Sequence, residues 1–395
     1  MKKVYFDNAA TTTLNGEVLN EMLPYLTDVY GNSSSLHSFG RDAMAGVDHA
    51  RDQIASAINA KSTEIYFTSG GTEANNWAIR GMAYANKSKG KHIIVSAIEH
   101  HSIIETCKAL EKEGFKVSYL PVDETGLVSV VNLLHELKPD TILVSVMMVN
   151  NEVGTIQHIK AIGNILKDAN TLFHCDAVQA LGSCEINVED MYIDALSMSS
   201  HKIHGPKGVG ALYVKKGTPI QKLVYGGEQE FNKRGGTLNV AGIVGFGKAM
   251  ELNIKNMAAS NKKLKELSSY FIKKVEYEID DIKINGNLRQ RAPGIVNISF
   301  NFVDGESLLM LLDLEGVAVS TGSACSAGSV EKSHVLKAMG LEMKDVSSAV
   351  RFSFSVDNTK EEIDYAVEVL VRAVDKLRGI TALTKKRKVV RNDVQ

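Results

Sequence analysis

The fold can be predicted outward from the stretch Leu196-Ser-Met-Ser-Ser-His-Lys-Ile-His-Gly-Pro-Lys-Gly208. An apolar run at 193–198 ends in two hydroxyls, a histidine and Lys202, and a Gly-Pro-Lys-Gly turn leads into a second apolar run at 209–214. This pattern predicts two strands joined by a polar loop that holds Lys202 between rigid elements. A lysine held in this way suits Schiff-base chemistry, although a solvated lysine in a turn has the same local sequence.

A second polar group ends another short apolar strand upstream, in Phe173-His-Cys-Asp-Ala-Val-Gln179. Pyridoxal phosphate (PLP) needs a lysine for its Schiff base and a carboxylate that keeps the pyridine nitrogen protonated. Lys202 and Asp176 supply this pair, each at the end of a predicted strand. An aspartate at a strand end can also be a turn former or a helix cap, so that alternative stays open.

Composition places the chain among ordinary globular enzymes. It has 395 residues, 44% hydrophobic and 23% charged, with a formal net charge of -1. That length allows two domains and a large core, and the balanced charge gives no reason to expect nucleic acid or a membrane surface as a partner. Residues 1–7 resemble no signal peptide and no apolar run is long enough to span a bilayer, so we expect a cytoplasmic protein.

Strands and helices alternate from about residue 91 to residue 214, which predicts an α/β fold with a largely parallel sheet covered on both faces. Functional loops then gather at the strand ends, where the candidates are Glu99-His100-His101, Asn150-Asn151-Glu152 and the Asp176 loop. A charged helical stretch at about 258–278 predicts the boundary to a smaller α+β unit. The basic stretch 384–391 predicts a flexible end of the chain.

A phosphate cradle is predicted where the strand in Glu64-Ile-Tyr-Phe-Thr-Ser-Gly-Gly-Thr72 breaks at its two glycines and a helix opens at Thr72. Exposed N–H groups at a helix start favour an anion, and glycines allow a ligand to approach the backbone. No Gly-Lys-Ser/Thr follows, which argues against a nucleotide triphosphate.

Seven ordered stretches together resemble the cysteine desulfurases of the NifS/IscS type, which are PLP-dependent members of the class V aminotransferase group. The resemblance covers residues 7 to about 377. The stretches are Ser69-Gly-Gly-Thr-Glu73, Glu99-His100, Val149-Asn-Asn-Glu152, His174-Cys-Asp-Ala-Val-Gln179, Ser199-Ser-His-Lys202, Arg234-Gly-Gly-Thr237 and Ser323-Ala-Cys325.

The resemblance implies the PLP-dependent transferase fold type I, like that of aspartate aminotransferase. A large domain (12–257) would carry a mainly parallel seven-stranded sheet. A smaller α+β domain (1–11 and 258–378) would carry a mobile cysteine loop, and residues 379–395 would form a basic, flexible tail.

The resemblance also implies roles for individual residues. Lys202 would be the Schiff-base lysine, Asp176 the partner of the pyridine nitrogen and Gln179 the partner of the phenolic oxygen. His100 would stack on the ring and handle protons. Phosphate contacts would come from Gly71, Thr72, Ser199, Ser200 and His201, with Thr237 reaching in from the other subunit of a homodimer. Asn151 and Arg351 would bind the substrate carboxylate.

Cys325 decides the reaction that this resemblance implies. It lies in Ser320-Thr-Gly-Ser-Ala-Cys-Ser-Ala-Gly-Ser329, a run of small residues that we expect to be a mobile loop. Cys325 would take sulfur from L-cysteine as a persulfide, leave alanine, and pass the sulfur to an iron–sulfur scaffold or another acceptor. No resident metal is implied, although Cys325 would transiently contact an iron–sulfur cluster on such a partner.

Three positions depart from the family pattern, namely Ser33, Ser200 and Lys332, and none removes a group that the chemistry needs. Two alternatives remain open: a selenocysteine lyase, which shares the cofactor and the lysine chemistry, and a non-catalytic PLP-binding assembly protein. The other cysteines, Cys107, Cys175 and Cys184, lack metal-ligand spacing and fit structural positions.

Overall fold

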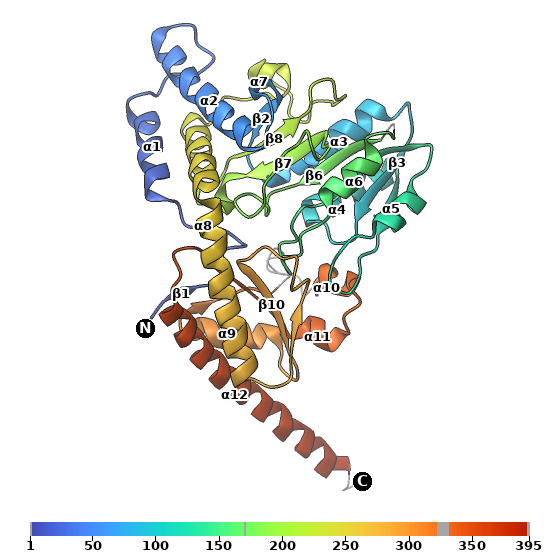
Figure 1. Ribbon diagram of the computed structural model, residues 1–395, viewed down its shortest axis with the longest axis vertical. Coiled ribbons are helices and arrows are strands. Elements are labelled where there is room, and N and C mark those ends of the chain that lie inside the picture. The colour runs from blue at the N-terminus through green and yellow to red at the C-terminus, as the bar shows by residue number, and fades with distance from the viewer. Residues whose placement is uncertain (1, 170, 322–331, 393–395) are drawn as a thin grey trace.

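A seven-stranded sheet forms the centre of the larger part of the molecule in the computed structural model, which describes residues 2–169, 171–321 and 332–392 (Figure 1). Its strands are ordered β2-β8-β7-β6-β5-β3-β4, and β8 alone runs against its neighbours. This confirms the predicted, mainly parallel sheet. The strands are β2 (Ile65–Thr68), β3 (His92–Ser96), β4 (Lys116–Leu120), β5 (Thr141–Ser145), β6 (Leu172–Asp176), β7 (Ala195–Ser199) and β8 (Gly210–Val214).

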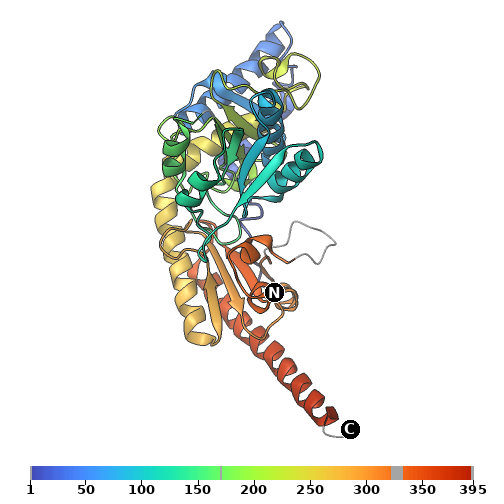
Figure 2. The same ribbon diagram turned by 90° about the vertical axis from the view of Figure 1, so that its right-hand side faces the viewer.

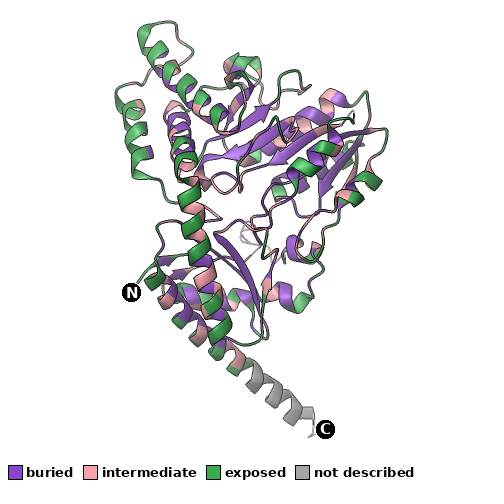
Figure 3. Ribbon diagram, viewed as in Figure 1, coloured by how far each residue is buried: buried purple, intermediate pink, exposed green. Residues whose placement is uncertain are grey.

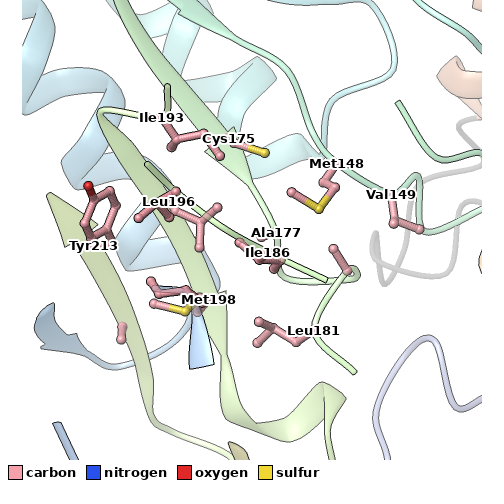
Figure 4. Close-up of a cluster of buried hydrophobic side chains, with 14 of the residues drawn as sticks. Met148, Val149, Cys175, Ala177, Leu181, Ile186, Ile193, Leu196, Met198 and Tyr213 are labelled. Carbon is pink, nitrogen blue, oxygen red and sulfur yellow. The ribbon is translucent and has the colours of Figure 1, made fainter. Parts of the chain in front are cut away.

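Helices cover both faces of this sheet because alternate strand residues point to opposite faces. In β3, Ile93 and Val95 pack with α3 and α4, whereas Ile94 belongs to the core on the other face. Figure 4 shows part of that other core, where Leu196 and Met198 of β7 lie near Cys175 of β6. The helices of this part are α2 (Ser38–Ala57), η1 (Ser62–Glu64), α3 (Gly71–Asn86), α4 (His101–Lys112), α5 (Val130–Glu136), α6 (Ile159–Leu166), η2 (Ser200–Lys202) and α7 (Gln229–Asn232).

The smaller part is an antiparallel sheet, ordered β12-β10-β9, with a parallel pair β1–β11 beside it. Its core contains a group of phenylalanines whose rings meet edge to face or at a tilt, among them Phe6, Phe271 and Phe352. The elements are β1 (Val4–Tyr5), β9 (Ile282–Asn285), β10 (Ile295–Phe300), α9 (Gly305–Leu314), β11 (Val317–Ala318), α10 (His334–Ala338), α11 (Met343–Ser347), β12 (Ala349–Ser353) and α12 (Lys360–Asn392).

One helix, α8 (Val240–Glu278), runs through both parts (Figures 1 and 2). Its beginning buries Phe246 and Met250 in the core of the large sheet, and its end buries Phe271 and Val275 in the core of the small one. The boundary predicted near residue 258 therefore falls inside a continuous helix and not in a loop.

The sequence missed one helix and shortened another. The apolar residues of α1 (Gly16–Thr27) recur at helical spacing, but a proline at position 24 argues against a helix; in the structure Asn15 caps its start. We expected the last helix to end near Leu377, whereas α12 continues to Asn392. Many of its residues beyond 377 are good helix formers (Arg, Ala, Leu, Lys), and basic residues suit a helix C-terminus.

Burial follows this architecture closely (Figure 3). The inner strands of both sheets are almost wholly buried, the edge strands β4 and β9 are partly exposed, and α1 and the start of α2 are largely exposed. No helix in the described part of the chain combines the length and apolar character that a membrane span requires.

Candidate active site

Lys202 lies in η2, directly after β7, at the carboxyl end of the parallel strands. Its Nζ donates hydrogen bonds to the carbonyl oxygens of Ala9 at 2.6 Å and Ala10 at 2.9 Å. The amine borders a cavity of about 160 Å³ that Asn8 and Gln179 also line. The sequence did not single out the 8–10 loop, whose backbone here fixes the lysine from across the site.

Asp176 is the last residue of β6, beside β7 in the sheet, and it is only 4% exposed. Its Oδ1 accepts from the Val178 N–H at 2.9 Å, and its Oδ2 accepts from Asn75 Nδ2 at 2.7 Å. Each carboxylate oxygen therefore has one donor fixed by the protein and retains room for a donor from a ligand.

His100 caps the start of α4, and its Nδ1 accepts from the backbone N–H of Ser102 at 3.1 Å. The Ser102 hydroxyl lies 2.8 Å from the same nitrogen and 2.9 Å from Asn75 Nδ2. Burial lowers the pKa of His100 more than the nearby Asp176 carboxylate raises it. Asn75, His100, Ser102 and Asp176 are called the cofactor side below.

The predicted phosphate cradle has the expected geometry at the start of α3. Gly70 has a φ of 152° and offers no side chain to cap the helix, so the first N–H groups stay available to an anion. A Cβ on Gly71 would lie 3.6 Å from the Ser199 Cβ, so these two predicted residues are neighbours. Thr72 is the second residue of the same helix.

Two further residues that were predicted to bind the phosphate face other groups of this chain. The Ser200 Oγ faces Gly205, where an added Cβ would lie 2.0 Å from it. His201 Nδ1 lies 3.1 Å from Thr11 Oγ1, and burial together with Lys202 lowers the pKa of His201 to about 4. Thr237 is exposed, in a loop that the paired Arg234 and Glu73 tie to the start of α3, at 2.8 Å.

Arg351 extends from β12 of the smaller part toward the larger one. Its Nη2 donates to Asp7 Oδ1 at 2.8 Å and its Nη1 donates to the Asn151 carbonyl oxygen at 2.9 Å. The guanidinium is 5% exposed, and its Nε has no hydrogen-bond partner among the described residues. The buried Nε therefore points to a missing acceptor, since an unpaired buried N–H is costly.

Glu152, next to Asn151, is almost fully buried and its Oε2 accepts from the Ser333 hydroxyl at 2.6 Å. Burial raises the pKa of Glu152 to about 7. Asp7, Asn151, Glu152, Ser333 and Arg351 are called the substrate side below.

Cys325 lies outside the described residues, but both flanks of the segment 322–331 are fixed at the site. Ser320 and Arg351 exchange backbone hydrogen bonds, at 2.6 and 3.2 Å. At the other flank, Ser333 is bonded to Glu152 and His334 Nε2 lies 2.9 Å from the Glu99 carbonyl oxygen.

Glu99 itself was predicted only as part of a motif. It is fully buried, and burial raises its pKa to about 8 although Ser96 donates to it. Its Oε1 accepts from the Ser96 hydroxyl at 2.6 Å and the Met147 N–H at 2.7 Å. This carboxyl thus braces the loop before His100 against the loop after β5.

The remaining cysteines are poor nucleophiles. Burial raises the pKa of Cys107 to about 12, that of Cys184 to about 11, and that of Cys175 well above its usual value. This burial agrees with the prediction that the three cysteines have structural roles. Over the described ranges, no three His, Cys, Asp or Glu side chains are grouped as metal ligands.

The chain matches the family model described as "Aminotransferase class-V" over residues 4–366. It is 51% identical to "Cysteine desulfurase IscS" of Dictyoglomus turgidum, with 96% of each chain covered. It is 48% identical to the protein of the same name from Methanosarcina thermophila, with 98% of this chain and 95% of that one covered.

Solved structures agree with these relatives. A "NIFS-like protein" superposes with a TM-score of 0.90 at 38% identity, covering 95% of this chain and all of that one. A NifS-like protein from Rickettsia africae gives a TM-score of 0.86 at 32% identity, with 95% and 100% covered. The predicted family and fold type are thereby confirmed: the chain belongs to the cysteine desulfurases of the PLP-dependent class V aminotransferase family.

Proposed function

We propose that this protein converts L-cysteine to L-alanine and carries the released sulfur on Cys325 as a persulfide. One observation carries the proposal: the cofactor side, the Lys202 amine, the buried guanidinium of Arg351 and both flanks of the Cys325 segment converge at one junction.

The residues present fit PLP. Lys202 offers an amine at the carboxyl end of the sheet, and the start of α3 offers unpaired N–H groups for a phosphate. The buried carboxylate of Asp176 can hold a proton on a pyridine nitrogen. PLP, when bound, supplies an electron sink that lets the bonds at the substrate Cα and Cβ be broken.

Arg351 is proposed to bind the substrate carboxylate with Asn151. Asp7 and the Asn151 carbonyl leave the Nε–H and one hydrogen on each Nη for a ligand. Nε–H and the outer Nη2–H form one edge of the guanidinium, which matches a carboxylate in a bidentate pair.

Cys325 is proposed to act from its loop. It lies five positions beyond Ser320 in the sequence, so it can lie as far as about 17 Å from that anchor. In the proposed step its thiolate forms an S–S bond with the substrate sulfur while the C–S bond breaks. The electron pair left on carbon takes a proton, so the products are alanine and a persulfide and no outside oxidant is needed.

Lys202 and His100 are proposed to move the protons of this reaction. The Lys202 amine, once released from the Ala9 and Ala10 carbonyl oxygens, is the group placed to take the Cα proton. His100 would lie over the ring with its Nε2 toward the reacting atoms, because Ser102 occupies its Nδ1.

A homodimer with Thr237 completing the partner's phosphate site is also proposed. Apolar side chains are exposed on α1, on the following loop and near Thr237; they include Leu26, Leu36, Tyr225 and Phe231. Several large exposed apolar side chains in one part of a molecule favour an interface.

We further propose an iron–sulfur scaffold or another sulfur-accepting protein as the partner, and the cytoplasm as the location. The domain limits 12–257, 1–11 with 258–378, and a flexible 379–395 tail also stay predictions. The division into two domains is supported by the two separate cores, which α8 joins.

The test is a single turnover of the PLP-loaded protein with excess L-cysteine, following alanine and intact mass. We expect alanine and a gain of one sulfur atom with the wild type and with Cys184→Ala, the matched control. Cys325→Ala should yield neither. Equal alanine release by Cys325→Ala would replace the persulfide mechanism with a lyase mechanism, and no alanine from the wild type would refute the proposed function.

A further inference from the structure

We propose that Asn75 is a positioning residue that links Asp176 to His100 through Ser102 and fixes the ring proton of His100 on Nε2. Neither Asn75 nor Ser102 belongs to the site residues expected from the sequence. The proposal deepens the proposed function, since it rests on the roles given there to Asp176 and His100.

The donor and the acceptor can be assigned for each hydrogen bond that links Asp176, Asn75, Ser102 and His100. The Ser102 backbone N–H can only donate, so His100 Nδ1, at 3.1 Å from it, must be the acceptor and must carry no proton. A neutral imidazole with an unprotonated Nδ1 carries its proton on Nε2.

The Asn75 amide determines the donor and the acceptor of the remaining hydrogen bonds. Its Nδ2 lies 2.7 Å from Asp176 Oδ2 and 2.9 Å from Ser102 Oγ, and the two hydrogens of one amide nitrogen serve both. Ser102 Oγ therefore accepts from Asn75 and is free to donate its own hydrogen to His100 Nδ1 at 2.8 Å.

The reversed amide is excluded by the same geometry. It would place the amide oxygen of Asn75 2.7 Å from a carboxylate oxygen of Asp176, where two acceptors repel. In the observed orientation the buried Asn75 Oδ1 has no hydrogen-bond partner among the described residues. An unsatisfied buried acceptor lowers the stability of the folded protein. Such a loss of stability is typical of a residue that is retained for function.

The consequence concerns the chemistry of His100. It presents an N–H, not a lone pair, to the reacting atoms, so it donates a hydrogen bond or a proton there and does not begin the reaction as a base. Asp176, Lys202, His101 and His334 are the charged and titratable groups around it, and none of them contacts Nδ1 within hydrogen-bond distance in the described residues.

The tautomer can be read directly by 15N NMR of the PLP-loaded protein with 15N-labelled histidine, and the His100→Gln variant identifies the His100 signals. We expect a pyridine-like Nδ1 and a pyrrole-like Nε2 at neutral pH. Ser102→Ala removes a hydrogen bond that favours the neutral ring, so the titration midpoint of His100 should rise by about one pH unit. Ser102→Thr, which keeps the hydroxyl, should restore it.

Asn75→Asp tests the amide itself, because the new carboxylate would accept the Ser102 hydrogen and take it from His100. We expect a rise of the midpoint at least as large as that of Ser102→Ala. Asn86→Ala is the matched control, since Asn86 is a buried asparagine on the same helix whose Nδ2 donates to the Met82 carbonyl oxygen and not to the linked residues.

A wild-type His100 with its proton on Nδ1 would overturn the proposal, as would shifts in Ser102→Ala and Asn75→Asp no larger than that of Asn86→Ala. These readings need no turnover. A protein that makes no alanine but shows the expected tautomer would therefore refute the proposed function and leave this inference standing.

Discussion

The cofactor side and the substrate side differ in how far along the chain their contacts reach. On the cofactor side, Asn75 bonds to residues 27 and 101 positions away, all at the edge of one sheet. On the substrate side, Arg351 bonds to residues 344 and 200 positions away, and Ser333 to one 181 positions away. The cofactor side is thus built within one rigid body, whereas the substrate side exists only where the two parts of the molecule meet.

From this difference we infer which kinetic constant, kcat or KM, each side controls. A substitution on the cofactor side alters groups that act in the reaction itself. Its effect persists at saturating cysteine, and so it should lower kcat. A change at the junction alters the binding of the substrate carboxylate, and so it should raise KM.

The largest effect should come from Lys202, which lies between the two sides. We expect Lys202→Ala to lower kcat by more than about 1000-fold, because the proposed reaction uses this amine both to bind the cofactor and to move the Cα proton. Alanine release measures this, and circular dichroism checks the fold. Activity within tenfold of the wild type would remove Lys202 from the chemistry.

The next largest effect concerns Glu99, which braces the two sides against each other. Its carboxyl has a pKa near 4.5 when unfolded and about 8 when folded, so between these values the folded protein holds a proton that the unfolded chain has lost. Stability therefore falls as pH rises through this window. Glu99 should contribute a loss on the order of 3 kcal/mol between pH 5 and pH 9.

Glu99→Gln, of the same shape but unable to ionise, should lose that part of the pH dependence in urea unfolding of the PLP-loaded protein. Glu105→Gln is the control on α4, because Lys108 lowers the pKa of the exposed Glu105. If Glu99→Gln kept the wild-type slope of stability against pH, the carboxyl would not be neutral in the folded protein.

Arg351 tests the substrate side in isolation. Arg351→Lys keeps a positive charge beside Asp7 but loses the planar fork, so we expect KM for L-cysteine to rise about 30-fold with kcat within a few-fold. Steady-state kinetics separates the two. A fall in kcat at unchanged KM would mean that Arg351 acts on the chemistry and would blur the distinction between the sides.

The smallest effect should come from Ser333, which both caps α10 and bonds to Glu152. We expect Ser333→Ala to lower stability by about 1 kcal/mol and to slow persulfide formation modestly, since only one anchor of the Cys325 segment is lost. Ser129→Ala, which removes the cap of α5, is the control: it should destabilise the protein without slowing persulfide formation.

The sequence pointed to site residues where the signal was a strand ending in a polar residue. Lys202 and Asp176 were found in this way, because parallel strands deliver their ends to one edge. Asn75 and Ser102 were missed, since each lies inside a helical pattern and nothing local shows that its side chain turns inward.

The substrate side was predictable only through family resemblance. Asp7 and Arg351 pair across almost the entire chain, and no local pattern encodes a contact of that range. Burial of Glu99 and Glu152 was equally hidden, because a glutamate in a polar loop is ordinarily exposed. The two missed helix segments have local causes: α1 contains Pro24, which argues against a helix, and the end of α12 is a basic stretch that predicts a flexible end of the chain.

The most direct measurement is to locate the sulfur itself. The PLP-loaded protein is given one turnover with 34S-labelled L-cysteine, its thiols are alkylated, and its peptides are mapped by mass spectrometry. We expect the label as a persulfide on the peptide that contains Cys325, in a yield equal to the alanine formed. Label on Cys107, Cys175 or Cys184, or alanine without labelled protein, would contradict Cys325 as the carrier.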